Sequence, residues 1–323
     1  MANRKRSRVV VIGGVNMDIK CRIAGRPAMA SSNPGMAALT PGGVARNIAE
    51  NLARLGVATS LISVVGRDRL GEQLIRETAR AGVDVRGVSR AAGPTGLYAA
   101  TLDARGELIV GVAAMAIVEQ LTPRRLQPHR RRIAAADLVV ADSNLPAATL
   151  DWLIDLAARQ GVPLAIETVS VPKGGKLRRL LRRKRPLFAL FCNRDEARAL
   201  TSRMAMRAAV RALHDMGVRH VCIGLGRGGM LVSSAEDGRM TAATVPALPA
   251  KAVDVTGAGD AAVAGTLFGL LRGEPLPMAA RYGQAAAALT VACERSVNPR
   301  LTVRRLLVAF GAPGPHPNPS ALW

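Results

Sequence analysis

The chain has 323 residues, of which 49% are hydrophobic, so it is long and apolar enough to fold around one large buried core. Its formal net charge of +22 makes polyanions natural partners, yet aromatic residues amount to only 2%. That low aromatic content argues against the stacking platforms on which nucleic-acid-binding proteins hold unpaired bases. The basic clusters at 130–132 and 178–185 lie beside apolar runs, so we interpret them as solvated faces and do not expect nucleic acid as a partner.

No apolar run reaches the roughly 18 to 20 residues that cross a bilayer, so we expect no membrane partner. Residues 1–8 form a basic N-terminal extension, and the apolar run that follows, Val9 to Val15, is too short for a signal sequence. The four cysteines lie far apart, without the spacing of metal ligands. We therefore expect reduced thiols, no structural zinc and a cytoplasmic protein.

Strand-like apolar runs alternate with helix-like stretches along residues 9–310, which predicts an α/β domain with a mostly parallel sheet flanked by helices. The helix-like stretches place apolar residues on one face, and each ends at a glycine. The expected strands include Val9–Ile12, Ser60–Val65, Leu138–Ala141, Pro163–Ile166, Leu187–Phe191 and His220–Ile223, and the expected helices include Asn47–Leu55, Leu70–Ala81 and Ala147–Arg159. Residues 311–323 contain four prolines and no periodicity, so we expect a disordered tail.

Two segments, at about 17–39 and 94–112, interrupt this alternation with extended stretches. In the second, Leu97–Leu102 and Glu107–Val110 flank the turn Asp103–Gly106, which predicts a hairpin. We expect the two segments to form a small β lid over the carboxyl ends of the parallel strands, where open α/β sheets bind ligands.

The strongest chemical signal is Asp254-Val-Thr-Gly-Ala-Gly-Asp260, which runs directly into a helix of small residues. Its two glycines let backbone N–H groups turn toward one point, and the start of the helix adds its positive dipole there, which predicts an anion hole. A carboxylate beside bound phosphate is useful when a group there loses a proton, so we interpret Asp260 as the general base for a hydroxyl that attacks a phosphoryl group. The alternative is an N-capping Asp after a glycine turn.

Two further motifs lie in the first fifty residues. Pro41-Gly-Gly-Val-Ala-Arg-Asn47 enters a helix, and its glycines allow close approach of a ligand while Asn47 offers a donor and an acceptor to hydroxyls. Gly13-Gly-Val-Asn-Met-Asp18 follows the first strand, so Asn16 and Asp18 would stand at the carboxyl edge of the sheet and bind vicinal sugar hydroxyls. The alternatives are a tight turn into a helix for the first motif and an Asx turn for the second.

Two motifs in the second half fit a nucleotide and its metal. Asn193 and Glu196 face one way on a first helical turn, which suits the water shell of Mg²⁺, although a capping box would use the same pair. Gly224-Leu-Gly-Arg-Gly-Gly229 is rich enough in glycine to lie against a nucleotide, but it does not match the Walker pattern. A hairpin turn explains it equally well.

With both glycine motifs in this order, the chain resembles the ribokinase/phosphofructokinase-B family of carbohydrate kinases from about Val9 to Leu307. Finer features resemble the branch of that family that acts on pseudouridine. These are Ser32-Asn-Pro-Gly35, Thr40-Pro-Gly-Gly-Val-Ala-Arg-Asn-Ile-Ala49, Val140-Ala-Asp-Ser-Asn144, Val169-Ser170 with Lys173, and Val255-Thr-Gly-Ala-Gly-Asp260.

The resemblance implies a Rossmann-like domain, a β lid that forms a homodimer, and transfer of the γ-phosphoryl group of ATP, with Mg²⁺, to the ribose 5′-hydroxyl of the nucleoside. It implies that Asn16, Asp18, Gly42, Gly43 and Asn47 bind the ribose, that Ser32 and Thr95 face the base, and that Lys173 neutralises phosphate charge. It further implies that Asn193 and Glu196 organise Mg²⁺ through water, that Gly257, Ala258 and Gly259 form the anion hole beside Asp260, and that Gly224, Gly226, Gly229, Thr256 and Asn298 line the ATP cleft. Asp254 and Thr256 match part of the family's monovalent-cation site, so K⁺ is a possible second ion.

Three features depart from that branch. Ala113-Ala114 stands where an Asp usually precedes Met115, Thr168 follows Glu167 where Pro is expected, and the stretch from Leu200 to Ala212 is short and rich in arginine. The first departure weakens the choice of base, so a kinase for another nucleoside or a ribose-type sugar stays an alternative. A basic nucleic-acid-binding protein on a retired kinase fold is a third hypothesis, against which the intact Asp260, Glu196 and Lys173 argue.

Overall fold

The computed structural model describes residues 7–236 and 238–311. The predicted basic extension and disordered tail lie outside these residues, except for residues 7, 8 and 311. Within the described part of the chain, no helix is both long and apolar enough to span a membrane.

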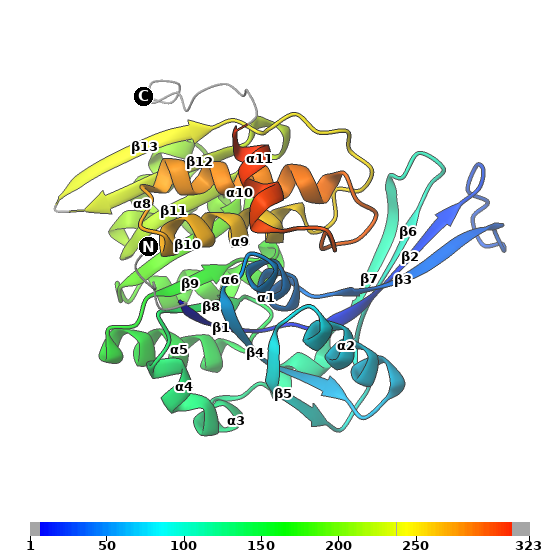
Figure 1. Ribbon diagram of the computed structural model, residues 1–323, viewed down its shortest axis with the longest axis horizontal. Coiled ribbons are helices and arrows are strands. Elements are labelled where there is room, and N and C mark those ends of the chain that lie inside the picture. Colours follow the sequence, from blue (N-terminus) through cyan, green and yellow to red (C-terminus); the bar gives the residue numbers. More distant parts are fainter. Residues whose placement is uncertain (1–6, 237, 312–323) are drawn as a thin grey trace.

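A nine-stranded sheet forms the centre of the molecule, in the order β13-β12-β11-β10-β9-β8-β1-β4-β5 (Figure 1). The seven strands from β11 to β5 in this order run parallel, and β12 and β13 add an antiparallel edge. The strands are β1 Arg8–Ile12, β4 Ala58–Gly66, β5 Asp84–Ala91, β8 Leu138–Asp142, β9 Leu164–Glu167, β10 Leu187–Asn193, β11 Val218–Gly224, β12 Met230–Glu236 and β13 Arg239–Val245. All six of the expected strand runs lie in this sheet, and the α/β fold with a mostly parallel sheet is confirmed.

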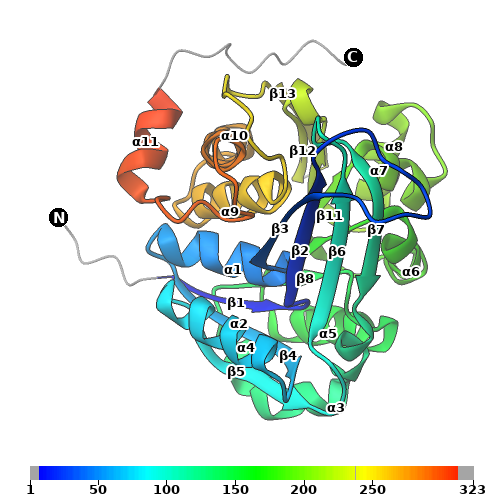
Figure 2. The same ribbon diagram turned by 90° about the vertical axis from the view of Figure 1, so that its right-hand side faces the viewer.

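Helices cover both faces of the sheet, so its inner parallel strands are buried on both sides, while the edge strand β5 is partly exposed. The face with Val9 and Val11 packs against α1, α9 and α10, while the face with Val10 and Ile12 packs against α5 to α8. Figure 2 shows α9 and α10 on one side and α6 to α8 on the other. The helices are α1 Val44–Arg54, α2 Arg69–Arg80, α3 Pro123–Leu126, α4 Arg130–Ala134, α5 Ala147–Gln160, α6 Val171–Leu181, α7 Arg194–Thr201, α8 Met206–Asp215, α9 Ala258–Leu271, α10 Leu276–Val291 and α11 Val303–Gly311, with short 3₁₀ turns at Ala116–Gln120, Gln127–His129 and Gly226–Gly228.

A separate four-stranded sheet, in the order β3-β2-β6-β7, projects from the side of the main body (Figure 1). Its strands are β2 Asn16–Ile23, β3 Gly35–Gly42, β6 Gly96–Leu102 and β7 Leu108–Ala114. We expected this lid at about 17–39 and 94–112, and β7 extends two residues farther, so that it includes Ala113 and Ala114. Because β2 begins where the loop after β1 ends, the lid is rooted at the carboxyl edge of the central sheet.

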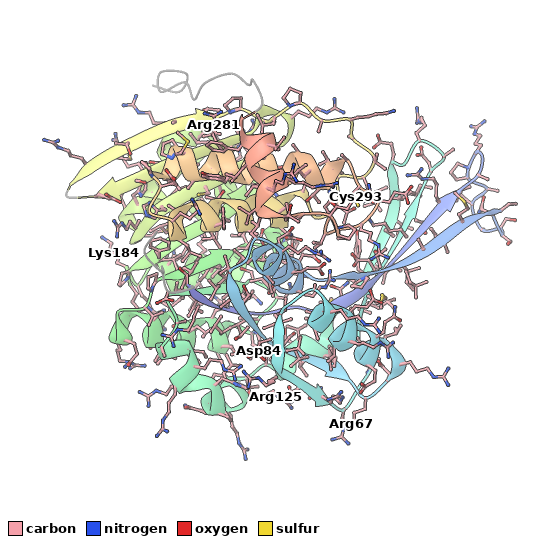
Figure 3. The ribbon with its side chains drawn as sticks, viewed as in Figure 1. Arg67, Asp84, Arg125, Lys184, Arg281 and Cys293 are labelled. Carbon is pink, nitrogen blue, oxygen red and sulfur yellow. The ribbon has the colours of Figure 1, made fainter. Side chains whose placement is uncertain are left out.

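The basic side chains are spread over the surface. Figure 3 shows Arg67, Arg125 and Lys184 on separate parts of the body, and many long side chains point outward from it. Outward-pointing basic side chains agree with the interpretation as solvated faces.

Candidate active site

A cleft of about 350 Å³ lies at the carboxyl edge of the sheet. It is bounded by the ends of β9, β10 and β11, the turn before β12, the start of α9 and one face of α10. Nine of the residues assigned from the sequence line it: Asn193, Glu196, Gly224, Gly226, Gly229, Gly257, Ala258, Gly259 and Asp260. The folded chain therefore brings the two glycine motifs of its second half together with the Asn193–Glu196 pair.

The turn before α9 requires glycine at position 257. Gly257 has a φ of +79°, and a Cβ built there would lie 1.9 Å from the carbonyl oxygen of Ser296. Within the described part of the chain no side chain caps α9, whose first turn begins at Ala258 and faces the cleft. The N–H groups and the dipole of this first turn are thus available for an anion.

Asp260 lies in that first turn but does not cap the helix, so the interpretation as an N-capping Asp is wrong. Its Oδ2 accepts a hydrogen bond of 2.8 Å from Nδ2 of Asn47, on α1. Desolvation by burial, together with the charges of Asp142 and Asp18, raises the pKa of Asp260 to about 7, against the opposing effects of Asn47 and Arg46. A carboxyl group with a pKa near neutrality is well matched to accept a proton from a hydroxyl.

Asp18 and Asn16 lie where the lid joins the body, and Asp18 stands within β2, so the Asx-turn interpretation is wrong. Asn16 Nδ2 donates to Asp18 Oδ1 at 2.6 Å, and Ser296 Oγ donates to Asp18 Oδ2 at 3.3 Å. Gly42 pairs with Asn16, and a Cβ at Gly42 would lie 2.3 Å from Asp18 Oδ2. The carboxylate of Asp18 therefore packs directly against the backbone of Gly42. Burial raises the pKa of Asp18.

Asp142 organises this end of the sheet, although the sequence motif that contains it indicated no role for it. At the end of β8 it accepts hydrogen bonds from the backbone N–H groups of Gly14, Ala45 and Asn144 at 2.8, 3.0 and 2.9 Å. It thereby fixes both the loop after β1, which leads to Asp18, and the start of α1, which carries Asn47. A polar residue directly after a buried strand is a signal that could have identified it.

Lys173, on α6, reaches the same edge through Asn144, because its Nζ donates to Asn144 Oδ1 at 2.6 Å. It is not among the side chains that line the cleft. Its predicted contact with phosphate stays a prediction.

Asn193 and Glu196 form a complete capping box at the start of α7. Asn193 Oδ1 accepts from the N–H groups of Asp195 and Glu196 at 2.9 Å, and Glu196 Oε2 accepts from the N–H of Asn193 at 2.8 Å. Both residues also line the cleft, so the capping role and the metal role are compatible. Both Glu196 oxygens already accept hydrogen bonds. Oε1 accepts from Asn193 Nδ2 at 2.7 Å, and Oε2 accepts from the N–H of Asn193 and the hydroxyl of Thr168. The described residues hold no cluster of three or more metal-ligating carboxylate, His or Cys side chains. The donor set fits Mg²⁺ held through water and substrate phosphates rather than by a protein cage.

The glycine-rich segment 224–229 serves as a hairpin turn and as a wall of the cleft. Gly224 pairs with Met230 across the β11–β12 hairpin, and both lie at the cleft together with Gly226 and Gly229. The two interpretations of this segment are therefore compatible.

Four further assigned residues, Ser32, Thr95, Thr256 and Asn298, do not line the cleft. Ser32 is exposed and lies in the loop beyond Ile23 and Gly35, the last paired residues of the hairpin of β2 and β3. At a rise of roughly 3.4 Å per residue, that last pair lies about 17 Å along the hairpin from the pair of Asp18 with Thr40. The Thr95 hydroxyl donates to Asp68 at 2.6 Å and accepts from the N–H of Gly66 at 2.9 Å.

The amide of Asn298 donates to the carbonyl of Leu289 at 2.5 Å and accepts from the N–H of Arg300 at 2.9 Å, and Thr256 donates its N–H to Asp254 at 2.8 Å. The assigned roles of these four residues stay predictions.

Besides Asp142, three functional candidates were missed in the sequence. Lys20, on β2, forms an ion pair of 2.5 Å with Asp254, which ties the lid to the turn that precedes α9. Glu167, at the end of β9, lines the cleft, and burial together with Asp260, Glu196 and Asp142 raises its pKa well above the ordinary value. Gln284, on α10, is buried and also lines the cleft. Only the position of Glu167 after an apolar strand gave a signal.

Comparisons with known proteins identify the family of the chain. The family model described as pfkB family carbohydrate kinase matches residues 6–302, and the chain belongs to that family. The chain is 36% identical to the sugar kinase YeiI of Escherichia coli K12, over 92% of this chain and 82% of that protein. It is 33% identical to the pseudouridine kinase of the same organism, over 94% and 96%.

Among solved structures, a carbohydrate kinase from Agrobacterium tumefaciens matches with a TM-score of 0.81 and 31% identity, over 96% of this chain and 99% of that one. The ribokinase of Arabidopsis thaliana matches with the same TM-score at 21% identity, which supports the ribokinase-like fold. The protein is thus a kinase of the carbohydrate and nucleoside class.

Proposed function

We propose that this kinase transfers the γ-phosphoryl group of ATP to the ribose 5′-hydroxyl of pseudouridine. The observation that carries the chemistry is Asp260, whose carboxylate stands beside the uncapped start of α9 and within hydrogen-bond distance of Asn47. Similarity to the pseudouridine kinase of E. coli over nearly the whole chain supports the choice of substrate.

Each group of site residues has a separate role in this phosphoryl transfer. Asp18 and Asn16 bind ribose hydroxyls, and Asp260 takes the proton from the 5′-hydroxyl as its oxygen attacks the γ-phosphorus and the bond to the β-phosphate oxygen breaks. The first turn of α9 stabilises charge on the transferred phosphoryl group. Magnesium, held through water by Asn193 and Glu196, would neutralise phosphate charge when bound.

The base specificity of the site depends on the lid. Ala113 and Ala114 pair with Tyr98 and Leu97 and bring no polar group to this end of β7. A kinase for another nucleoside or a ribose-type sugar is therefore the second candidate, and a guanosine-inosine kinase and a ribokinase are each 26% identical to this chain over 88% and 77% of its length.

The lid is also the proposed dimer interface. Large apolar side chains are exposed on it, on β3 and β7: Met36, Leu39, Leu108, Ile109, Val110 and Val112. Burying such a patch against a second copy would remove it from water. Dependence on K⁺ and a cytoplasmic location stay predictions.

A panel of acceptors tests the proposal. Purified protein with ATP and Mg²⁺ is offered pseudouridine, uridine, adenosine, inosine and ribose, and ADP release is followed with the phosphorylated product identified by mass. We expect pseudouridine to give the highest kcat/KM. Turnover of another acceptor without turnover of pseudouridine would identify the second candidate as the correct function.

A further inference from the structure

Arg46, on α1 directly before Asn47, is a buried arginine with 5% of its surface exposed. Its guanidinium donates to the carbonyl of Pro41 at 3.1 Å, to Asn47 Oδ1 at 3.0 Å and to Glu50, with which it forms a buried ion pair. A buried charge is costly unless it is paired and hydrogen-bonded. Arg46 meets that condition, but it does not line the cleft, so any effect on a reaction there passes through its neighbours.

The neighbour that matters is the amide of Asn47, which has one acceptor atom and one donor group. A guanidinium can only donate, so the amide oxygen must face Arg46. The amide nitrogen then faces Asp260 Oδ2, at 2.8 Å. With the amide turned over, its oxygen would face Asp260 and would favour the protonated carboxyl group, which cannot act as a base.

We propose that Arg46 is a positioning residue for the general base, because it holds the Asn47 amide in the orientation that donates to the Asp260 carboxylate. The inference rests on the proposed role of Asp260. It adds a residue that contacts neither substrate but decides whether the base is in its active form.

The electrostatic surroundings of Asp260 make this role necessary. Asp18 on β2 and Asp142 on β8 both raise the pKa of Asp260 through their negative charges. Arg46 is the cation that opposes them at Asp260, and its loss would raise the pKa of Asp260 above its value of about 7. Because the base must be deprotonated, activity at neutral pH would fall and would recover as the pH rises.

A purely structural role must be separated from this one. Glu50 is also buried, and Arg54 donates to its other oxygen at 2.7 Å. Arg46→Met alone would leave Glu50 short of one partner, so the test variant is the double substitution Arg46→Met/Glu50→Gln, which removes both charges of the pair. Arg54→Met is the matched control, since it takes the other arginine from Glu50 without touching Asn47.

The experiment measures kcat and kcat/KM against pH, from pH 5.5 to 9.5, for the parent, the double variant and the control. For the double variant we expect the acid limb to move up by about one pH unit, which lowers turnover at pH 7 about fivefold because the parental base has a pKa of about 7, with KM for ATP within about twofold. Arg54→Met should keep the parent profile. Arg46→Lys, which keeps one donor for Asn47, should recover part of the shift.

An acid limb at the parent's position in a folded double variant, or the same shift in Arg54→Met, would overturn the proposal. If the double variant does not fold, as judged by circular dichroism, the Arg46→Lys profile decides: a shift in the same direction supports the proposal and an unchanged limb refutes it. Asp260→Asn with parental turnover would instead refute the base assignment, so the two failures are distinguishable.

Discussion

Gly257→Ala is expected to damage both stability and catalysis, because one glycine shapes the anion hole and the wall of the sugar site. Its φ of +79° would cost a residue with a Cβ about 1 to 3 kcal/mol. The new Cβ would also lie 1.9 Å from the carbonyl oxygen of Ser296, so the loop around Ser296 must move. Overpacking of this kind costs about 1 to 3 kcal/mol, and partial relaxation leaves an expected loss of about 3 kcal/mol.

For a chain of 323 residues, that loss corresponds to a decrease in Tm of about 4 °C. The catalytic effect should be larger, since movement of Ser296 breaks its hydrogen bond to Asp18 and distorts the first turn of α9. We expect kcat to fall by about 10²- to 10³-fold, as when a donor to developing charge is lost.

Gly273→Ala is the matched control at the other end of α9. Gly273 has a φ of +83°, but a Cβ there meets no atom within 4 Å. Its stability loss should be that of the backbone strain alone, with activity unchanged. Thermal unfolding and ADP release on the same preparations check both variants, and equal Tm and kcat for the two would refute the argument from the collision with Ser296.

Three further predictions follow from the same contacts. Asp260→Asn should remove most turnover, yet it should raise Tm at pH 8 and not at pH 4. A carboxyl group with a pKa raised from 3.8 to about 7 destabilises the folded state by up to about 4 kcal/mol as the pH rises through that window, and the substitution removes this cost. A lower Tm at pH 8 would contradict this reasoning. Lys20→Met should raise KM for the nucleoside several-fold because it removes the ion pair that connects the lid to Asp254, while Lys20→Arg should keep that pair and the parental KM. Equal KM values for the two variants would show that the ion pair does not hold the lid in place for substrate binding. Val112→Asp on the lid should shift the sedimentation coefficient toward a monomer, whereas Val308→Asp on α11 should not, and an unchanged dimer in both would place the interface elsewhere.

Local signals in the sequence were sufficient for the sheet and for the separate motifs. Apolar runs such as Leu138–Ala141 are buried on both faces and therefore read clearly as strands. The glycine turn before Asp260 predicted a helix N-terminus that could hold an anion, because anion binding at a helix start depends on a few adjacent residues.

Contacts between distant segments could not be predicted in the same way. The Asn47–Asp260 bond joins residues 213 positions apart, and the Lys20–Asp254 pair joins residues 234 positions apart. Both depend on the crossing of α1 with α9 and on the tilt of the lid, which no local pattern specifies. Thr95 shows the converse, since the hydroxyl that the resemblance assigned to the nucleobase donates to Asp68, which is the N-cap residue of α2.

The distribution of charge leads to a last prediction, on the metal. The chain has a net charge of +22, yet the cleft lining formed by residues 7–236 and 238–311 includes Glu167, Glu196 and Asp260 and no lysine or arginine. A polyphosphate would enter such a site against negative charge, offset by the start of α9, so it must bring its own counter-charge. We therefore expect ATP to bind only as its magnesium complex, and isothermal titration in EDTA should show at least about tenfold weaker ATP binding than in Mg²⁺. Equal affinity in the two buffers would mean that the arginine excess, rather than a metal, neutralises the phosphates.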